Sequence, residues 1–254
     1  MNAKMIAMVY VLTRRAGAPK AGTPSPRGPS PHLAVRVPVR ARSQNRCAFA
    51  GCWLALALLG ASPAARAQTP PRGDYDPASS AWNGISELVA LAGERGVRLD
   101  TPAEIEVTAL DRADGVLLLH PVRGLPLASL AAFLRSGGRL ALADDFGAGE
   151  ELLSLYGIRR AAPAGEDAAR LRGNAQLLIA TATSRHPLTE GVGNLVTNHP
   201  AELQHPALDP VFALGEGEGA LVLTGAVEQG RLVALSDPSV LINNMQRFKG
   251  NARF

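Results

Sequence analysis

The two signs of charge are segregated along this 254-residue chain. Residues 1–67 contain ten Lys or Arg and no acid, whereas residues 68–254 contain 16 Lys or Arg and 22 Asp or Glu, a net charge of −6. The basic isoelectric point therefore belongs to the first quarter, and the acidic remainder argues against nucleic-acid binding. Both cysteines precede residue 68, which excludes a disulfide, a thiolate nucleophile or a cysteine metal site beyond it.

The first 45 residues read as a basic leader that is too rich in Pro, Gly and Ser to bury a core. This composition predicts disorder over residues 1–45. It is also unusual ahead of an export signal, and we interpret it as a start codon assigned too far upstream. Translation would then begin near residues 35–39.

An export signal follows the leader. The apolar run 48–61 is preceded by three arginines and followed by Ala65-Arg66-Ala67, which is the order of a signal peptide. We predict a signal peptide over residues 46–67, cleaved before Gln68, and a periplasmic or outer-face location at the cytoplasmic membrane. An uncleaved N-terminal anchor is the alternative, although the run is shorter than the ~18 to 20 residues that span a bilayer.

The folded part follows a linker over residues 68–78. Apolar residues at helical spacing predict helices over 82–95 and 127–134, and apolar runs predict strands at 97–99, 116–119 and 139–143. Further on we expect a helix from about residue 148, a turn of helix at 187, and strands at 177–181, 195–196, 221–223 and 232–235. Helices interleaved with buried strands predict one α/β domain over residues 79–254, with a mostly parallel sheet and some antiparallel additions.

Several of these segments resemble domains of known protein families. Residues 111–121, 127–134 and 137–147 resemble the glutamine-amidotransferase-like domains of gliding-type ABC transport systems. With Trp82-Asn83-Gly84 and residues 230–239, the chain is similar to a bacterial family called domain of unknown function 4350 (DUF4350). The resemblance implies a three-layer flavodoxin-like (class I glutamine-amidotransferase-like) fold. It also implies a membrane-associated setting beside ABC transporter-like or MoxR-type ATPase systems, but no reaction.

The chain departs from true glutamine amidotransferases at the nucleophile. Those enzymes need a thiolate on a sharp strand-to-helix turn with a histidine beside it. Residues 68–254 contain no cysteine and no Gly-x-Ser-x-Gly replacement. We therefore exclude amide hydrolysis by that mechanism and predict no catalytic residue of that kind.

The candidate site lies at one rim of the predicted sheet. Ligands of open parallel sheets bind outside the carboxyl ends of the strands, where Asp144-Asp145-Phe146 and Ser236-Asp237 are expected. The three acids could hold a divalent cation, but an acid between a strand and a helix more commonly caps the helix or fastens the loop. Trp82 and Asn83 could line a nearby pocket, or Trp82 could anchor the first helix. We predict no metal site and no cofactor, since the loop histidines match no standard ligand spacing.

Two functional classes remain. The favoured one is a noncatalytic binding or scaffold domain that works with a membrane protein complex, with an unidentified small-molecule ligand and no nucleic acid. The alternative is a hydrolase using Asp144, Asp145 and Asp237, with or without a metal ion. Asn251 is a typical N-cap residue three positions before the chain ends, so we also expect a truncated C-terminal helix.

Overall fold

The computed structural model describes residues 8–14, 73–102, 107, 110–111, 114–161, 168–216 and 219–254. The predicted signal peptide, and the leader apart from residues 8–14, lie outside these ranges, so their predictions stand as predictions. Among the helices in the described ranges, none is both long and apolar enough to cross a bilayer.

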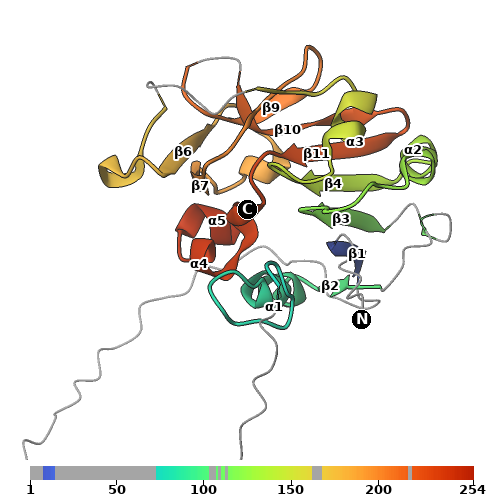
Figure 1. Cartoon of the computed structure of the whole chain (residues 1–254), viewed down its shortest axis with the longest axis horizontal. Helices are drawn as coiled ribbons and strands as arrows, with labels where there is room; N and C mark the ends of the chain where they lie inside the picture. The colour runs from blue at the N-terminus through green and yellow to red at the C-terminus, as the bar shows by residue number, and fades with distance from the viewer. Residues whose placement is uncertain are drawn as a thin grey trace, which may run out of the picture. The chain divides into compact units, whose positions relative to one another are not determined.

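The described residues form one mixed sheet of 11 strands (Figure 1). Its main path runs through β2 (Val97–Asp100), β1 (Met8–Arg14), β3 (Gly115–Leu119), β4 (Arg139–Ala143), β11 (Gly230–Leu235), β10 (Ala220–Val227), β9 (Asp209–Ala213), β6 (Leu177–Ala182) and β7 (Asn194–Asn198). β5 (Arg159–Ala161) pairs with β8 (Glu202–Gln204), and β8 in turn pairs with β10.

The prediction of a mostly parallel, flavodoxin-like three-layer fold is wrong. Only β3 with β4 and β4 with β11 are parallel, and all the other pairs among the described strands are antiparallel. A parallel pair needs a crossover of a dozen or more residues, whereas short turns join the late strands. The predicted hairpin turn after β10, where Val227 pairs with Gly230, is one of these.

The predicted crossover in the first half of the domain is confirmed. β3 leads through helix α2 (Leu127–Arg135) to β4, and the two strands are parallel with Leu117 opposite Ala141. These strands are covered on both faces, which explains their uninterrupted apolar sequence.

One strand comes from the stretch predicted to be disordered. β1 lies between β2 and β3 and is antiparallel to both. The side chain of Tyr10 is fully buried, and its hydroxyl donates a hydrogen bond of 2.8 Å to the carbonyl oxygen of Tyr75. Residues 8–14 are rich in β-branched and aromatic residues, which favour strands, but their signal is concealed when composition is averaged over the whole leader.

Two apolar clusters pack on opposite faces of the sheet. In β3, Leu117 and Leu119 belong to one cluster and Val116 and Leu118 to the other, as the period of two requires. The remaining helices are α1 (Ser86–Glu94), α3 (Glu150–Leu155), α4 (Asn243–Gln246) and α5 (Lys249–Arg253), with the 3-10 turns η2 (Leu171–Gly173), η3 (Pro187–Thr189) and η4 (Pro238–Leu241). Figure 1 shows α1, α4 and α5 grouped together, apart from α2 and α3.

Candidate functional site

Three neighbouring parallel strands end at the same edge of the sheet. Leu119, Ala143 and Leu235, the last residues of β3, β4 and β11, stand in register. The residues that follow, His120, Asp144 and Ser236, therefore lie side by side. The predicted acidic loops are brought together at this edge by the parallel part of the sheet.

Asp144 is a buried acid that fastens the loop before α3. Its Oδ1 accepts a hydrogen bond of 2.9 Å from the amide of Gly147, and its Oδ2 accepts one of 3.0 Å from the amide of Gly149. The guanidinium of Arg160 lies 3.1 Å from Oδ2. Burial raises the pKa of Asp144, although these partners lower it in part. A Cβ atom at Gly147 would lie 2.2 Å from Oδ1, so only glycine fits this arrangement.

Asp237 is a second buried acid, and donors on three other residues engage it. Its carboxylate accepts hydrogen bonds from the hydroxyl of Thr197, from the amide of Asn198 at 2.6 Å, and from the amide and hydroxyl of Ser239, each at 2.8 Å. Burial raises the pKa of Asp237, and these bonds oppose the shift. Asp237 therefore caps η4 and ties it to the end of β7.

Ser236, the other predicted residue of this loop, is fully buried. Its hydroxyl oxygen has no hydrogen-bond partner within the described part of the chain. Asp237 and Ser236 are thus inside the domain rather than on an accessible surface.

Asp145 faces outwards and meets His120, which the sequence did not single out as a site residue. The Nδ1 atom of His120 lies 3.1 Å from Oδ1 of Asp145 and 3.5 Å from Oδ1 of Asp144. His120 has a φ of 43°, an uncommon backbone conformation for a residue other than glycine. A histidine directly after a buried strand was the available signal, but only the register shows that it faces both acids.

Tyr75 completes the surroundings of His120. The two ring centroids lie 5.6 Å apart. Burial raises the pKa of the Tyr75 hydroxyl above its ordinary value, and the negative charge of Asp145 adds to the shift. The phenol is thus neutral over the physiological range and contributes an apolar ring with a polar tip.

These side chains could hold a divalent cation. Ligand atoms of His120, Asp144 and Asp145 all lie within 4.8 Å of one another. One imidazole nitrogen and two carboxylates suit Zn²⁺ or Mn²⁺. The positive charge of Arg160 beside Asp144 acts against a cation.

Two large aromatic side chains are exposed in the loops that precede α1 and α3. Phe146 is 71% exposed and Trp82 is 67% exposed. Trp82 precedes α1, whose N-cap residue Ile85 is the fully buried contact to the core, so Trp82 does not anchor that helix. The backbone carbonyl oxygen of its neighbour Asn83 accepts a 2.8 Å hydrogen bond from the amide of Tyr75, and the side-chain Nδ2 of Asn83 donates one of 2.5 Å to Oδ1 of Asp74.

Contacts link Asn83 to Asp145, and Trp82 and Phe146 are their neighbours in the sequence. Trp82 is adjacent to Asn83, which contacts Tyr75; Tyr75 contacts His120, and His120 contacts Asp145. We call the surface formed by Tyr75, Trp82, His120, Asp145 and Phe146 the aromatic rim. Of the seven predicted site residues, Trp82, Asp145 and Phe146 belong to it, Asn83 supports it, and Asp144, Ser236 and Asp237 lie beneath the surface.

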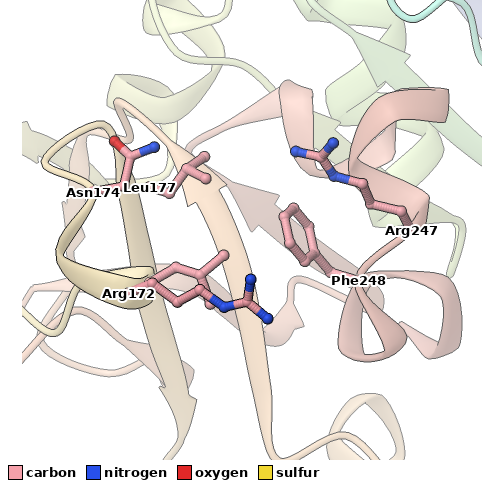
Figure 2. A pocket seen from close by; sticks show the side chains of 6 residues that line it. Arg172, Asn174, Leu177, Arg247 and Phe248 are labelled. Carbon is pink, nitrogen blue, oxygen red and sulfur yellow. The ribbon is translucent and has the colours of Figure 1, made fainter.

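A basic pocket lies elsewhere, between η2 and the segment after α4. Figure 2 shows Arg172 and Arg247 directed towards Phe248 from two sides of the pocket. The guanidinium carbon of Arg247 lies 4.9 Å from the ring centroid of Phe248. The pocket has a volume of about 470 Å³, and the sequence predicted none of its residues as site residues.

Several solved structures align with part of the chain. The mmIFT52 N-terminal domain aligns with 14% identity and a TM-score of 0.42, over 54% of this chain and 71% of that one. An exo-β-1,4-mannosidase, Op5Man5 from an Opitutaceae bacterium, aligns with 16% identity and a TM-score of 0.36, over 54% of this chain and 23% of that one. The cytoplasmic protein STM1381 from Salmonella typhimurium aligns with 16% identity and a TM-score of 0.35, over 50% and 58%. These TM-scores are too low to bear on function.

No curated protein matches the chain. The family model of a domain of unknown function, DUF4350, matches residues 77–254. This range runs from the loop that carries Trp82 to the last residue of the chain, and it includes both acidic loops. The chain belongs to the DUF4350 family.

Proposed function

We propose that this DUF4350 domain is a noncatalytic binding module and that the aromatic rim is its ligand surface. The observation that carries the proposal is the exposure of Trp82, in the loop after Tyr75, and of Phe146, next to Asp145 of the His120–Asp145 pair. Large exposed aromatic side chains are characteristic of binding surfaces, where they anchor a partner once water is displaced. The acidic and imidazole groups between them supply polar contacts for orientation.

The buried acids support binding over acid–base catalysis. Both oxygens of Asp144 and of Asp237 accept hydrogen bonds from their own domain, and neither side chain is exposed. A general acid or base must reach the proton that it transfers. These two carboxylates therefore act on the loops rather than on a substrate.

We further propose that the partner is a membrane protein complex of the ABC transporter-like or MoxR-type kind, met on the outer side of the cytoplasmic membrane. The resemblance of the chain to glutamine-amidotransferase-like domains of gliding-type transport systems supports this proposal. The order of basic residues, apolar run and small residues over 46–67 supports export.

Substitutions in the rim test the binding function. Phe146→Ser and Trp82→Ser should reduce binding to purified outer-face subunits of the proposed transporter-like complex by about tenfold or more, as the loss of ~1.4 kcal/mol requires. The control is Leu155→Ser, which removes another apolar side chain that is 51% exposed. Unchanged capture by both rim variants, at unchanged melting temperatures, would remove the rim as the binding surface.

N-terminal sequencing of the exported protein tests the location. We expect a mature terminus at Gln68. Cleavage there would separate β1 from the domain, so the experiment should be paired with mass analysis for a retained leader peptide; a retained peptide that contains residues 8–14 would contradict the reassigned start while leaving the cleavage standing. Intact exported protein that carries residues ahead of Arg40 would contradict both the cleavage and the reassigned start.

A metal-dependent hydrolase is the second proposal, because the ligand atoms of His120, Asp144 and Asp145 converge. The proposed metal ligands are therefore His120, Asp144 and Asp145, and Asp237 is not among them. Zn²⁺ or Mn²⁺ should then raise the melting temperature of the wild type and leave that of His120→Asn unchanged. Equal responses of the two proteins would rule out this site.

A further inference from the structure

A second cavity, at the opposite ends of the same three parallel strands, has a different chemistry from the rim. It has a volume of about 720 Å³, within the ~300–1,000 Å³ typical of small-molecule sites. Leu12, Ala141 and Val233 lie along one wall, and Pro187 and Leu188 of η3 line it as well. Apolar side chains therefore make up most of its surface.

The register of the sheet explains why this space is open. Leu12, Gly115, Arg139 and Arg231 stand in one row across β1, β3, β4 and β11, so their side chains point to the same face. Gly115 contributes no side chain to this row, and a Cβ built there would contact only Leu12, at 3.5 Å. The next row on that face contains the small residue Ala141. Two small residues in neighbouring rows leave the hollow.

The two charged side chains that line this cavity, Arg139 and Arg231, are both positive. Arg139 and Arg231 are direct neighbours in the row, and like charges placed opposite each other in a sheet are destabilising. Neither makes an ion pair or a side-chain hydrogen bond with any residue that the structure describes. The described residues that line the cavity include no Asp or Glu.

His186 provides a third hydrogen-bond donor in the cavity, in addition to the two guanidinium groups. Its Nδ1 atom accepts a hydrogen bond of 3.1 Å from the amide of Leu188. The proton of the neutral imidazole is therefore on Nε2, which is a hydrogen-bond donor. Three donor side chains and an apolar wall together match an anion that carries an apolar chain.

We propose that this cavity binds a free fatty acid, with the carboxylate held by Arg139 and Arg231 and the acyl chain lying along Leu12, Ala141 and Val233. Guanidinium groups bind carboxylates through paired, charge-assisted hydrogen bonds. The apolar wall distinguishes this ligand from a small hydrophilic anion, because burial of each methylene group adds to binding. The site is separate from the aromatic rim and does not depend on the function proposed for the rim, but its wall includes Leu12 of β1, so it requires a chain that keeps residues 8–14.

Calorimetry on the full chain tests the chemical class. Dodecanoate, kept below its micelle concentration, should bind at least ten times more tightly than butyrate and than dodecanol. Butyrate binding as tightly as dodecanoate would overturn the role of the apolar wall. Dodecanol binding as tightly would overturn the role of the arginines. A lysophospholipid of the same chain length that bound more tightly would overturn the assignment to a free fatty acid.

Variants locate the site. Arg139→Gln and Arg231→Gln should each weaken dodecanoate binding about tenfold, a loss of ~1.4 kcal/mol, and both side chains are exposed, so folding should persist. Arg172→Gln, in the pocket of Figure 2, is the matched control and should bind normally. Ala141→Leu should fill the hollow and abolish binding. Normal binding by both the Arg139 and Arg231 variants would refute the proposal.

Discussion

The Nδ1 atom of His120 lies 3.1 Å from Oδ1 of Asp145, across the ends of β3 and β4. The neighbouring acid, Asp144, is 1% exposed and is held by backbone amides and by Arg160. The carboxylates of Asp144 and Asp145 thus have different structural roles. Asp144 organises the loop, and Asp145 presents its charge to the surface with His120.

Removing each of these acids should therefore have a different cost. Asp144→Ala removes the carboxylate nearest to Arg160, whose side chain is 12% exposed, and leaves it only the exposed Glu150 at 3.6 Å; it should cost about 3 to 5 kcal/mol of unfolding free energy. Asp145→Ala should cost no more than about 1 kcal/mol, since the side chain of Asp145 is 24% exposed and that of its neighbour His120 is 30% exposed. Urea unfolding of both variants gives the comparison. Equal costs of the two substitutions would contradict these separate roles of Asp144 and Asp145.

The stability of the domain should decrease as pH rises above about 4, the ordinary range for Asp. Burial raises the pKa of both Asp144 and Asp237, so the folded state binds more protons than the unfolded state between the unfolded and folded pKa values. This contribution is complete below the unfolded pKa and is lost as pH rises through the folded pKa.

The unfolding free energy, measured in urea from about pH 4 to about pH 7, checks this dependence. Asp237→Asn removes one titrating group and should reduce the slope, whatever its own effect on stability. A wild-type free energy that increased with pH over this interval would contradict the direction given for the two acids.

Two glycines in and before α1 should respond oppositely to alanine. A Cβ at Gly84 would lie 2.1 Å from the carbonyl oxygen of Ser79, so Gly84→Ala should displace the loop that carries Tyr75 and Trp82 and lower the melting temperature. A Cβ atom added at Gly93 would have no other atom within 4 Å, and Gly93 lies inside α1. Gly93→Ala should therefore stabilise the domain by about 0.5 to 1 kcal/mol. The melting temperatures of the two variants, compared with that of the wild type, test both predictions.

Asn251 should be important for stability, although it is not the N-cap that the sequence predicts. It lies inside α5 and is buried, where its Oδ1 accepts from the amide of Val196 and its Nδ2 donates to the carbonyl oxygen of Val196. Asn251→Leu leaves both groups of β7 unpaired and should cost about 1 to 3 kcal/mol. The exposed Asn244 is the control, and a similar cost for Asn244→Leu in urea unfolding would refute the explanation.

Local sequence determined the crossover unit and the late hairpin. Apolar runs over β3 and β4, helical spacing in α2 and the turn at residues 228–229 each depend on neighbours in the chain, so their structures could be predicted from the sequence. The sequence also placed Phe146 and Asp145 in one loop. It did not decide which of two adjacent acids would be buried.

The tertiary structure decided the rest, because strand pairing is non-local. Whether a late strand lies parallel or antiparallel depends on its partner rather than on its own residues, and this is why the mostly parallel sheet was predicted wrongly. The same pairing brings Met8–Arg14 between β2 and β3 and sets His120 against Asp145. It also aligns Arg139 with Arg231, more than 90 residues apart in the chain, a relationship that only the register of β4 and β11 establishes.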